Sequence, residues 1–369
     1  MRYKLSDCVT IISGGTPKKS QESYWNGNIP WITVKDFNGK YVSTTTDSIT
    51  LEGLKHSSAN LTEDQDILIS ARGTVGKVLM VGAGYTFNQS IYCLRADRSV
   101  LVPDYLFYWL EKNVSLVKQG THGSVFETIT KDTFNHLTID LPDLKEQYQI
   151  AHKLSMFDRK INLNEQINDN LFKLAKIHFD RQLDSENIKF SQISTIQNGY
   201  AFKSKEYVDT NELMILRTKN INDNHLFSKN DVVYISKELF DEYKKFSFSA
   251  FDTVLVMVGA SIGKTGFVTS NMTPSLQNQN MWRFRPKMSN IPGLLIFQYV
   301  NYINKHIIGS ATGSARSFYR KKLFSEFEVP RINSTNYIYF DTLQREIDHL
   351  NTENEILYRI KHSLLNHYF

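Results

Sequence analysis

Cysteine is nearly absent from this sequence of 369 residues, which contains only Cys8 and Cys93. Two cysteines cannot build the disulfide framework of a small secreted domain, and these two do not form a metal-type cluster. No stretch approaches the roughly 18 apolar residues that a membrane-spanning helix requires, and residues 1–7 lack the apolar run of a signal peptide. We therefore expect a cytoplasmic protein with no membrane partner.

Catalytic signatures are equally scarce. The ten histidines are scattered, with no i, i+4 pair of zinc-ligand type, and neither a nucleophile elbow nor the Asn/Asp-Pro-Pro-aromatic loop of a DNA adenine methyltransferase is present. Residues 259–265 approach a phosphate-binding loop, but three residues separate the glycines instead of four and no helix-forming run follows. We predict a tight turn between two strands there, no catalytic site, and no cofactor in this chain.

Neither sign of charge dominates the whole chain, which contains 43 Lys and Arg and 38 Asp and Glu. The distribution is nevertheless uneven. Residues 189–333 contain 19 Lys and Arg against 11 Asp and Glu, whereas residues 1–144 contain 14 against 15. A segment with a net charge of +8 indicates a polyanion as partner.

The feature that the sequence does have is an internal repeat with a period of roughly 185–190 residues, too long for a solenoid unit. Five segments recur in the same order: residues 4–14 return as 189–199, 32–36 as 216–220, 66–77 as 252–264, 87–92 as 277–282, and 120–124 as 309–314. This order predicts that the chain contains two copies of one structural plan.

Each copy contains two kinds of pattern. Short β-branched runs bounded by glycine, such as 67–69 and 254–256, predict buried strands, and the apolar runs 105–110 and 294–300 predict core helices. Beyond Pro142 and Pro330, apolar residues recur at spacings of three and four over 145–183 and 336–369. Such spacing predicts long amphipathic helices, the first about 55–60 Å long.

We therefore predict an α+β fold: two similar mixed α/β domains separated by two long antiparallel helices that form a coiled-coil-like spacer, with a pseudo-twofold relation between the halves. The predicted domains are residues 1–144, a central helix and linker at 145–188, residues 189–334, and a C-terminal helix at 335–369.

Polar residues shared by both copies are candidates for DNA contact. Asn88-Gln89 and Asn278-Gln279 precede predicted strands, and their amides either pair with adenine in the major groove or cap a turn. Lysines recur at the end of one predicted strand and beyond the glycine turn, where they either contact phosphate or are ordinary surface charges. These lysines are Lys35 and Lys219, and Lys77 and Lys264.

The order of these motifs resembles the specificity subunit of type I restriction–modification enzymes, over the whole chain. Gly14-Gly15-Thr16-Pro17 with residues 24–32 is similar to the opening of a target recognition domain in that family, and the glycine turn with Asn88-Gln89 matches its later landmarks. Residues 199–204 form another common opening, which differs from the first and so implies a different half-site.

The resemblance implies a non-catalytic subunit that binds double-stranded DNA and reads a bipartite, asymmetric target. Its implied partners are two modification methyltransferase subunits and restriction/translocase subunits, and S-adenosylmethionine, ATP and Mg²⁺ are implied for those partners only. Two alternatives stay open at this point. One is a tandem DNA-binding regulator without methyltransferase partners, and the other is a P-loop hydrolase, which would require ATPase activity of the isolated chain.

Recognition should fall mainly on residues that differ between the halves, with phosphate contacts from the shared lysines. The candidate DNA-contacting residues are Lys18, Lys19, Lys35, Arg72, Thr74, Lys77, Asn88, Gln89, Lys203, Lys205, Arg217, Lys219, Ser261, Lys264, Asn278, Gln279, Arg316 and Arg320.

Asparagines interrupt the apolar seam of both predicted long helices, at Asn164 and Asn354. Both lie near the middle of their helix, and equivalent residues of a duplicated antiparallel pair meet only near the pseudo-twofold axis. Asparagines that face each other in an apolar seam can specify its register at some cost in stability. We predict that the two side chains meet and help to set the helix-pair register, the alternative being two solvent-facing asparagines.

The uneven charge leads to a measurable expectation. The domain at 189–333 should contribute more of the salt-dependent DNA affinity than the domain at 1–144, because the release of counterions scales with the number of phosphates that a protein neutralises. Binding of each isolated domain to its own half-site across a salt series tests this, and a steeper slope for the first domain would contradict it.

Overall fold

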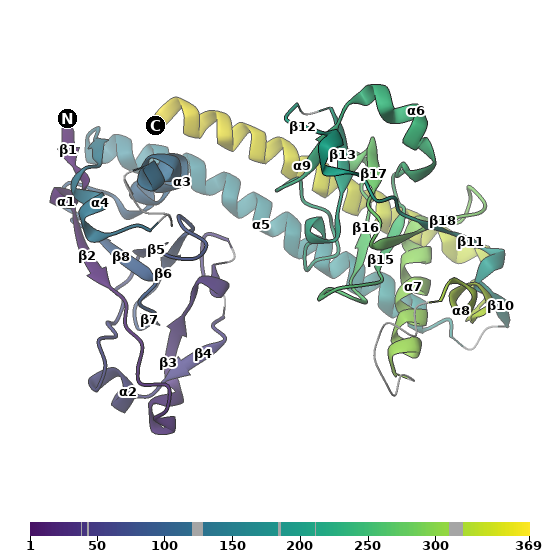
Figure 1. Cartoon of the computed structure of the whole chain (residues 1–369), viewed down its shortest axis with the longest axis horizontal. Helices are drawn as coiled ribbons and strands as arrows, with labels where there is room; N and C mark the ends of the chain where they lie inside the picture. The colour runs from purple at the N-terminus through teal and green to yellow at the C-terminus, as the bar shows by residue number, and fades with distance from the viewer. Residues whose placement is uncertain (38, 43, 120–127, 184–185, 211, 310–319) are drawn as a thin grey trace. The chain divides into compact units, whose positions relative to one another are not determined.

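The computed structural model describes residues 1–37, 39–42, 44–119, 128–183, 186–210, 212–309 and 320–369. The chain divides into two compact units. Unit 1 comprises Met1–Lys160 with Tyr358–Phe369, and unit 2 comprises Ile161–Leu357 (Figure 1). Segments 120–124 and 310–314, which belong to the expected repeat, and Arg316 lie outside the described residues.

Unit 1 contains three small sheets and one long core helix. A four-stranded antiparallel sheet has the order β2 (Val9–Ser13), β8 (Ile91–Ala96), β5 (Asp66–Ser70), β6 (Val78–Val81). A three-stranded sheet has the order β4 (Asp47–Ile49), β3 (Trp25–Ile32), β7 (Thr86–Phe87), and β1 (Arg2–Lys4) pairs with β9 (Thr138–Asp140). The helices are α1 (Leu5–Cys8), α2 (Leu51–Lys55), α3 (Pro103–Gln119), α4 (Lys131–Asn135), the first part of α5 (Leu144–Asp180) and the end of α9 (Tyr337–Tyr368).

Unit 2 repeats this plan. Its first sheet has the order β11 (Ser194–Asn198), β18 (Met281–Pro286), β15 (Thr253–Val256), β16 (Thr265–Phe267), and its second the order β12 (Tyr207–Val208), β14 (Val233–Ile235), β13 (Leu213–Leu216), β17 (Ser275–Gln277). Strand β10 (Asn187–Lys189) pairs with β19 (Glu328–Pro330). The helices are the second part of α5, α6 (Phe240–Tyr243), α7 (Gly293–Gly309), α8 (Lys321–Glu326) and most of α9 (Tyr337–Tyr368).

The strand pairings confirm the duplication. In each unit the first sheet, β2-β8-β5-β6 or β11-β18-β15-β16, is antiparallel, while the second sheet contains one parallel pair, β3 with β7 or β13 with β17. The long helices also lie close to the predicted ranges. Helix α5 covers the 37 residues Leu144–Asp180, where 145–183 was predicted, and α9 covers the 32 residues Tyr337–Tyr368, where 336–369 was predicted. The Asp143 carboxylate accepts a hydrogen bond from the Glu146 N–H at 2.8 Å, which starts α5 directly after Pro142.

Both long helices contribute to the cores of the units in which they lie. In unit 1, Leu154 of α5 and Leu365 of α9 belong to the same buried cluster as α3. In unit 2, Phe172 and Phe340 belong to the cluster around α7. Contacts in unit 2 also give the direction of the helices, since His178 stacks on Tyr339 at 4.0 Å between ring centroids and Asn164 contacts Asn354. Within unit 2 the two helices therefore run antiparallel.

A buried ion pair joins the same two strands in each unit. In unit 1, Arg95 of β8 donates to both carboxylate oxygens of Asp66 on β5, at 3.0 and 2.8 Å. In unit 2, Arg285 of β18 donates to both oxygens of Asp252, which directly precedes β15, at 2.7 and 2.6 Å. Burial without a partner would be costly for a carboxylate, and a bidentate arginine offsets this cost. The hydrogen bond to Asp66 raises the pKa of Arg95.

This repeated pair allows a stability prediction. Asp252→Ala should lower the free energy of unfolding by about 3–5 kcal/mol, because it leaves Arg285 without its partner next to a buried site. Chemical denaturation of the full chain measures the change. Lys322→Ala is the control, since its pair with Glu326 is exposed and should change stability by less than about 1 kcal/mol. Equal effects of the two variants would contradict the assignment.

Candidate nucleic-acid interface

Most of the candidate residues lie in connections at strand ends, where loop side chains are free to vary without changing the core. Lys18 and Lys19 follow β2, and Arg72 and Thr74 lie in the turn between β5 and β6. All four are exposed. Their counterparts in unit 2 are also exposed and lie after β11 and between β15 and β16: they are Lys203, Lys205 and Ser261. Arg320 is exposed directly before α8.

The glycine segments are turns between antiparallel strands, as predicted. Gly73 and Gly76 have φ of +76° and +86°, and Gly259 and Gly263 have φ of +92° and +84°. These left-handed values explain the glycines, because a side chain would be strained there. Each turn leads straight into a strand, β6 or β16, and not into a helix. A phosphate-binding loop of P-loop type is therefore absent at both described turns.

Lys35 and Lys219 lie one turn beyond the positions predicted for them. Strands β3 and β13 end at Ile32 and Leu216, and the lysines lie in the following 3-10 turns, Val34–Asp36 and Thr218–Asn220. A side-chain oxygen forms each turn: the Thr33 N–H donates to Asp36 at 2.7 Å and the Arg217 N–H donates to Asn220 at 2.9 Å. This local capping ends the strand, which the β-branched sequence alone does not indicate.

The two lysines beyond the glycine turns contact the segment that follows these 3-10 turns. Lys77 Nζ donates to the Phe37 carbonyl at 3.4 Å, and Lys264 Nζ pairs with Asp223 at 2.9 Å. The hydrogen bond from Lys264 lowers the pKa of Asp223. In each unit the structure thus brings the lysine beyond the glycine turn, Lys77 or Lys264, into contact with the segment that follows the 3-10 turn.

Two of the unit 2 candidates are partly engaged within the chain. The Arg217 guanidinium donates to the Asp231 carbonyl, and Lys219 Nζ lies 3.4 Å from the Asp231 carboxylate. Lys219 is exposed and its pair is exposed as well, so a phosphate can replace this partner at little cost. Arg217 is only half-exposed, and it would have to leave a structural contact to reach DNA.

The Asn-Gln pairs occupy the turn between β7 and β8 and the turn between β17 and β18. Asn88 Oδ1 accepts from the Ser90 N–H at 3.0 Å, which caps the turn, and Gln89 accepts a hydrogen bond from the Thr16 hydroxyl. In unit 2, Asn278 is half-buried and Gln279 is exposed. The capping contact supports the scaffold alternative for Asn88, while base reading by these residues stays a prediction.

The domain openings pack directly on these turns. A Cβ on Gly14 would lie 2.0 Å from the Asn88 carbonyl oxygen, and a Cβ on Gly199 would lie 1.8 Å from the Asn278 carbonyl oxygen. Both distances are too short for any side chain. The backbone of the opening glycine therefore packs directly against the backbone of the Asn in the turn. This contact explains why the glycine and the Asn recur together in both copies.

One basic cluster was not among the predicted residues. Burial, and after it the charge of Lys245, lowers the pKa of Lys321. Lys321 follows the candidate Arg320, and its Nζ lies 3.4 Å from the Ile196 carbonyl. The consecutive basic residues at 244–245 and 320–322 were the available signal in the sequence.

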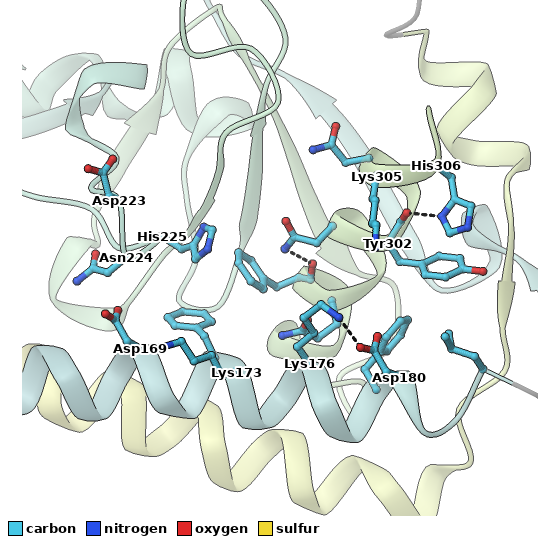
Figure 2. Close-up of a pocket in the computed structure, with 17 residues that line it drawn as sticks. Asp169, Lys173, Lys176, Asp180, Asp223, Asn224, His225, Tyr302, Lys305 and His306 are labelled. Atoms are coloured by element: carbon cyan, nitrogen blue, oxygen red, sulfur yellow. Dashed lines mark hydrogen bonds and ion pairs between the residues drawn. The ribbon is translucent and has the colours of Figure 1, made fainter. Parts of the chain in front are cut away.

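A cavity of about 860 Å³ lies in unit 2 between α5, α7 and residues 223–225 (Figure 2). Aromatic side chains line much of it, and at its rim Lys176 pairs with Asp180. None of the predicted DNA-contacting residues that the structure describes lines this cavity. Among the described residues, no group of three or more His, Cys, Asp or Glu is arranged to hold a metal ion, and no helix is long and apolar enough to cross a membrane.

The two seam asparagines meet inside unit 2. Asn164 Nδ2 donates to Asn354 Oδ1 at 2.8 Å and to Glu353 Oε2 at 2.7 Å, and both asparagines are buried. Within the described parts of the chain, Asn164 Oδ1 has no hydrogen-bond partner, and neither does either polar side-chain atom of Asn168 one turn further along α5. The contact is as expected from the sequence, and its role in setting the register stays a prediction.

Comparison with known proteins identifies the class. A family model described as the type I restriction modification DNA specificity domain matches residues 1–172 and 182–359, once for each copy of the repeat. The crystal structure of a type I restriction-modification S subunit from M. genitalium has the same fold, with a TM-score of 0.55 at 15 % identity, covering 99 % of this chain and 94 % of that one.

The chain belongs to the type I restriction–modification DNA specificity family and contains two copies of its domain. The MjaVIII specificity subunit of Methanocaldococcus jannaschii is 23 % identical over 358 residues, which are 89 % of this chain and 81 % of that protein. The MjaIX specificity subunit of the same organism is 31 % identical over 177 residues, 47 % of this chain and 41 % of that protein, so this match spans less than half of the relative. The resemblance expected from the sequence is confirmed, and the role of the family is DNA recognition, not catalysis.

Proposed function

We propose that unit 1 and unit 2 each read one half of a bipartite, asymmetric DNA target and that helices α5 and α9 act as the spacer between the two readers. The observation that carries this is the double match of the family model to a duplicated fold whose openings, residues 14–17 and 199–204, differ in sequence. Equivalent scaffolds with different loops are suited to reading different half-sites, because the backbone contacts hold the loops while the side chains supply specificity.

The finer architecture follows from the same proposal. The two recognition domains, residues 1–144 and 189–334, are related by a pseudo-twofold axis, and the antiparallel pairing seen within unit 2 extends along the helix pair. Two modification methyltransferase subunits dock on the helices, and restriction/translocase subunits join the assembly. S-adenosylmethionine, ATP and Mg²⁺ belong to those subunits, and this chain supplies the DNA sequence information.

Co-expression tests the proposal. The full chain is produced with candidate methyltransferase subunits in a host that lacks other adenine methylation, and the methylated adenines in the genomic DNA are mapped. A stable complex and a split motif with a fixed gap are expected. A tandem DNA-binding regulator would instead bind its site tightly alone and form no methylating complex, which would refute the proposal.

The half-site assignment gives a residue-level prediction. Arg72→Ala or Lys18→Ala should relax or weaken methylation at the first half-site only, and Ser261→Ala or Lys203→Ala at the second only, because each contacts one half of the DNA. A lost base contact should cost about 1–3 kcal/mol in discrimination. Methylation of duplexes with single-base changes in either half measures this, and a uniform loss at both halves would indicate a structural role.

The seam asparagines give a prediction about the spacer. Replacing both Asn164 and Asn354 with leucine should raise the melting temperature by about 2–4 °C, since it removes a buried polar atom without a partner. The same variant should methylate targets whose gap is one base pair longer or shorter more readily, because the hydrogen bond no longer selects one register. A lower melting temperature or unchanged gap selectivity would contradict the register role.

A further inference from the structure

Lys40 and His225 occupy equivalent places in the two units, although they are different residues. In unit 1 the Met80 N–H on β6 donates to the Lys40 carbonyl at 2.8 Å, and in unit 2 the Phe267 N–H on β16 donates to the His225 carbonyl at 2.8 Å. In both units the next residue forms a parallel bridge to the same strand residue. The segment after the 3-10 turn is thus held on the outer strand in the same register.

The side chain of Lys40 connects this segment to the core helix of unit 1. Its Nζ lies 2.6 Å from Asp104 Oδ1 and donates to the Tyr108 hydroxyl at 3.0 Å, both on α3. The ammonium also lies 4.4 Å from the centroid of the Tyr108 ring. Only 7 % of the Lys40 side chain is exposed. Burial of an ammonium group is tolerated only with such partners, so these contacts constrain the segment strongly.

The contact continues into the long helices. The Tyr108 hydroxyl donates to Asp158 of α5 at 2.5 Å. Lys361 of α9 lies 2.7 Å from Asp158 and 2.9 Å from Glu111 of α3. Lys40 is therefore one end of an ionic network that includes α3, α5 and α9 within unit 1.

In unit 2, His225 connects the corresponding segment to the helices through contacts of its ring with aromatic side chains. Its ring lies 5.7 Å from the Phe172 ring of α5 and 5.2 Å from the Phe297 ring of α7 (Figure 2). Its Nδ1 lies 3.2 Å from the Thr265 hydroxyl, which donates to Asn301 of α7 at 3.0 Å. The backbone φ of His225 is +67°. A left-handed conformation is unfavourable for histidine, so the surrounding contacts must hold it.

We infer that Lys40 and His225 are positioning residues that fasten the segment after the central strand to the helical core of each unit and so place the candidate DNA-contacting lysines. The segments directly follow the 3-10 turns that contain Lys35 and Lys219. They also contact Lys77, through the Phe37 carbonyl, and Lys264, through Asp223. Loss of either anchor frees both the segment and the turn lysine in that unit. Only the DNA readout of this inference rests on the proposed function.

The different chemistry of the anchors makes them distinguishable by pH. Burial lowers the pKa of His225 below its ordinary value, while Asp169 on α5 and Asp223 on its own segment oppose the shift and Lys264 on the glycine turn adds to it. Because the folded state then binds fewer protons than the unfolded state, the contribution of His225 is lost as pH falls below about 6.5.

Hydrogen exchange on the full chain tests the inference without DNA. Lys40→Met should speed exchange in residues 71–77 and in the segment from Val34 to Tyr41, and leave residues 257–264 unchanged. His225→Ala should do the reverse. Lys131→Met, an exposed lysine of α4, is the control, and Lys40→Arg should restore slow exchange because it keeps the charge. Unchanged exchange at 71–77 in Lys40→Met, or faster exchange throughout unit 1 including β1 and β9, would overturn the inference.

Methylation by the co-expressed complex supplies the second readout. Lys40→Met should lower activity on duplexes that depend on the first half-site roughly tenfold or more, the effect expected for one lost charged hydrogen bond. His225→Ala should lower the methylation that depends on the second half-site. In the wild-type complex, a change from pH 7 to pH 5.5 should weaken only the methylation that depends on the second half-site. If Lys40→Met unfolds unit 1, Tyr108→Phe removes the same link more mildly. Equal loss at both half-sites would refute the positioning role, whereas absence of methylation by the wild type would refute the proposed function and leave the exchange result decisive.

Discussion

The fold depends on one constraint: the sheets of each unit are too small to bury their own apolar faces. Their strands contain only two to eight residues, and a short strand pair does not form a stable core by itself. In each unit the core is completed by one apolar helix, α3 or α7, and by residues of both α5 and α9. The long helices are therefore part of the folding units and not linkers added to finished domains.

The duplication keeps the backbone contacts and varies the chemistry around them. The contact between the opening glycine and the Asn turn, the turn between antiparallel strands and the bidentate Arg–Asp pair recur in both units. Around these invariants the side chains diverge, as at Lys40 and His225, where an ionic network in one unit corresponds to an aromatic cluster in the other. A scaffold of this type allows loop side chains to change without loss of the fold, because such changes leave the shared backbone contacts and the Arg–Asp pair intact.

The polar groups buried in unit 2 between α5 and α9 show that helix pairing here is not optimised for stability alone. Asn164 and Asn354 satisfy each other only in part, and the side-chain amide of Asn168 has no partner among the residues that the structure describes. An all-apolar seam would bury the same area without leaving polar groups unpaired, but it would also accept several registers. Under the proposed function, in which the helix pair is the spacer between two readers, a single register would be worth this cost, since a shift of the seam would change the gap that is read.

The sequence by itself determined the repeat, the core helices, the two long helices and the family. Apolar periodicity and the order of glycine and polar motifs are properties of the sequence that can be recognised without knowing the tertiary contacts. The turn between strands at 259–265 and the meeting of Asn164 with Asn354 were also accessible, the latter from the symmetry of a duplicated antiparallel pair. Only the tertiary structure decided which lysines come together with the segments after the 3-10 turns and that Lys40 corresponds to His225. These features depend on side chains far apart in the sequence, and a single chain carries no signal for such contacts when the two residues share neither type nor neighbouring motif.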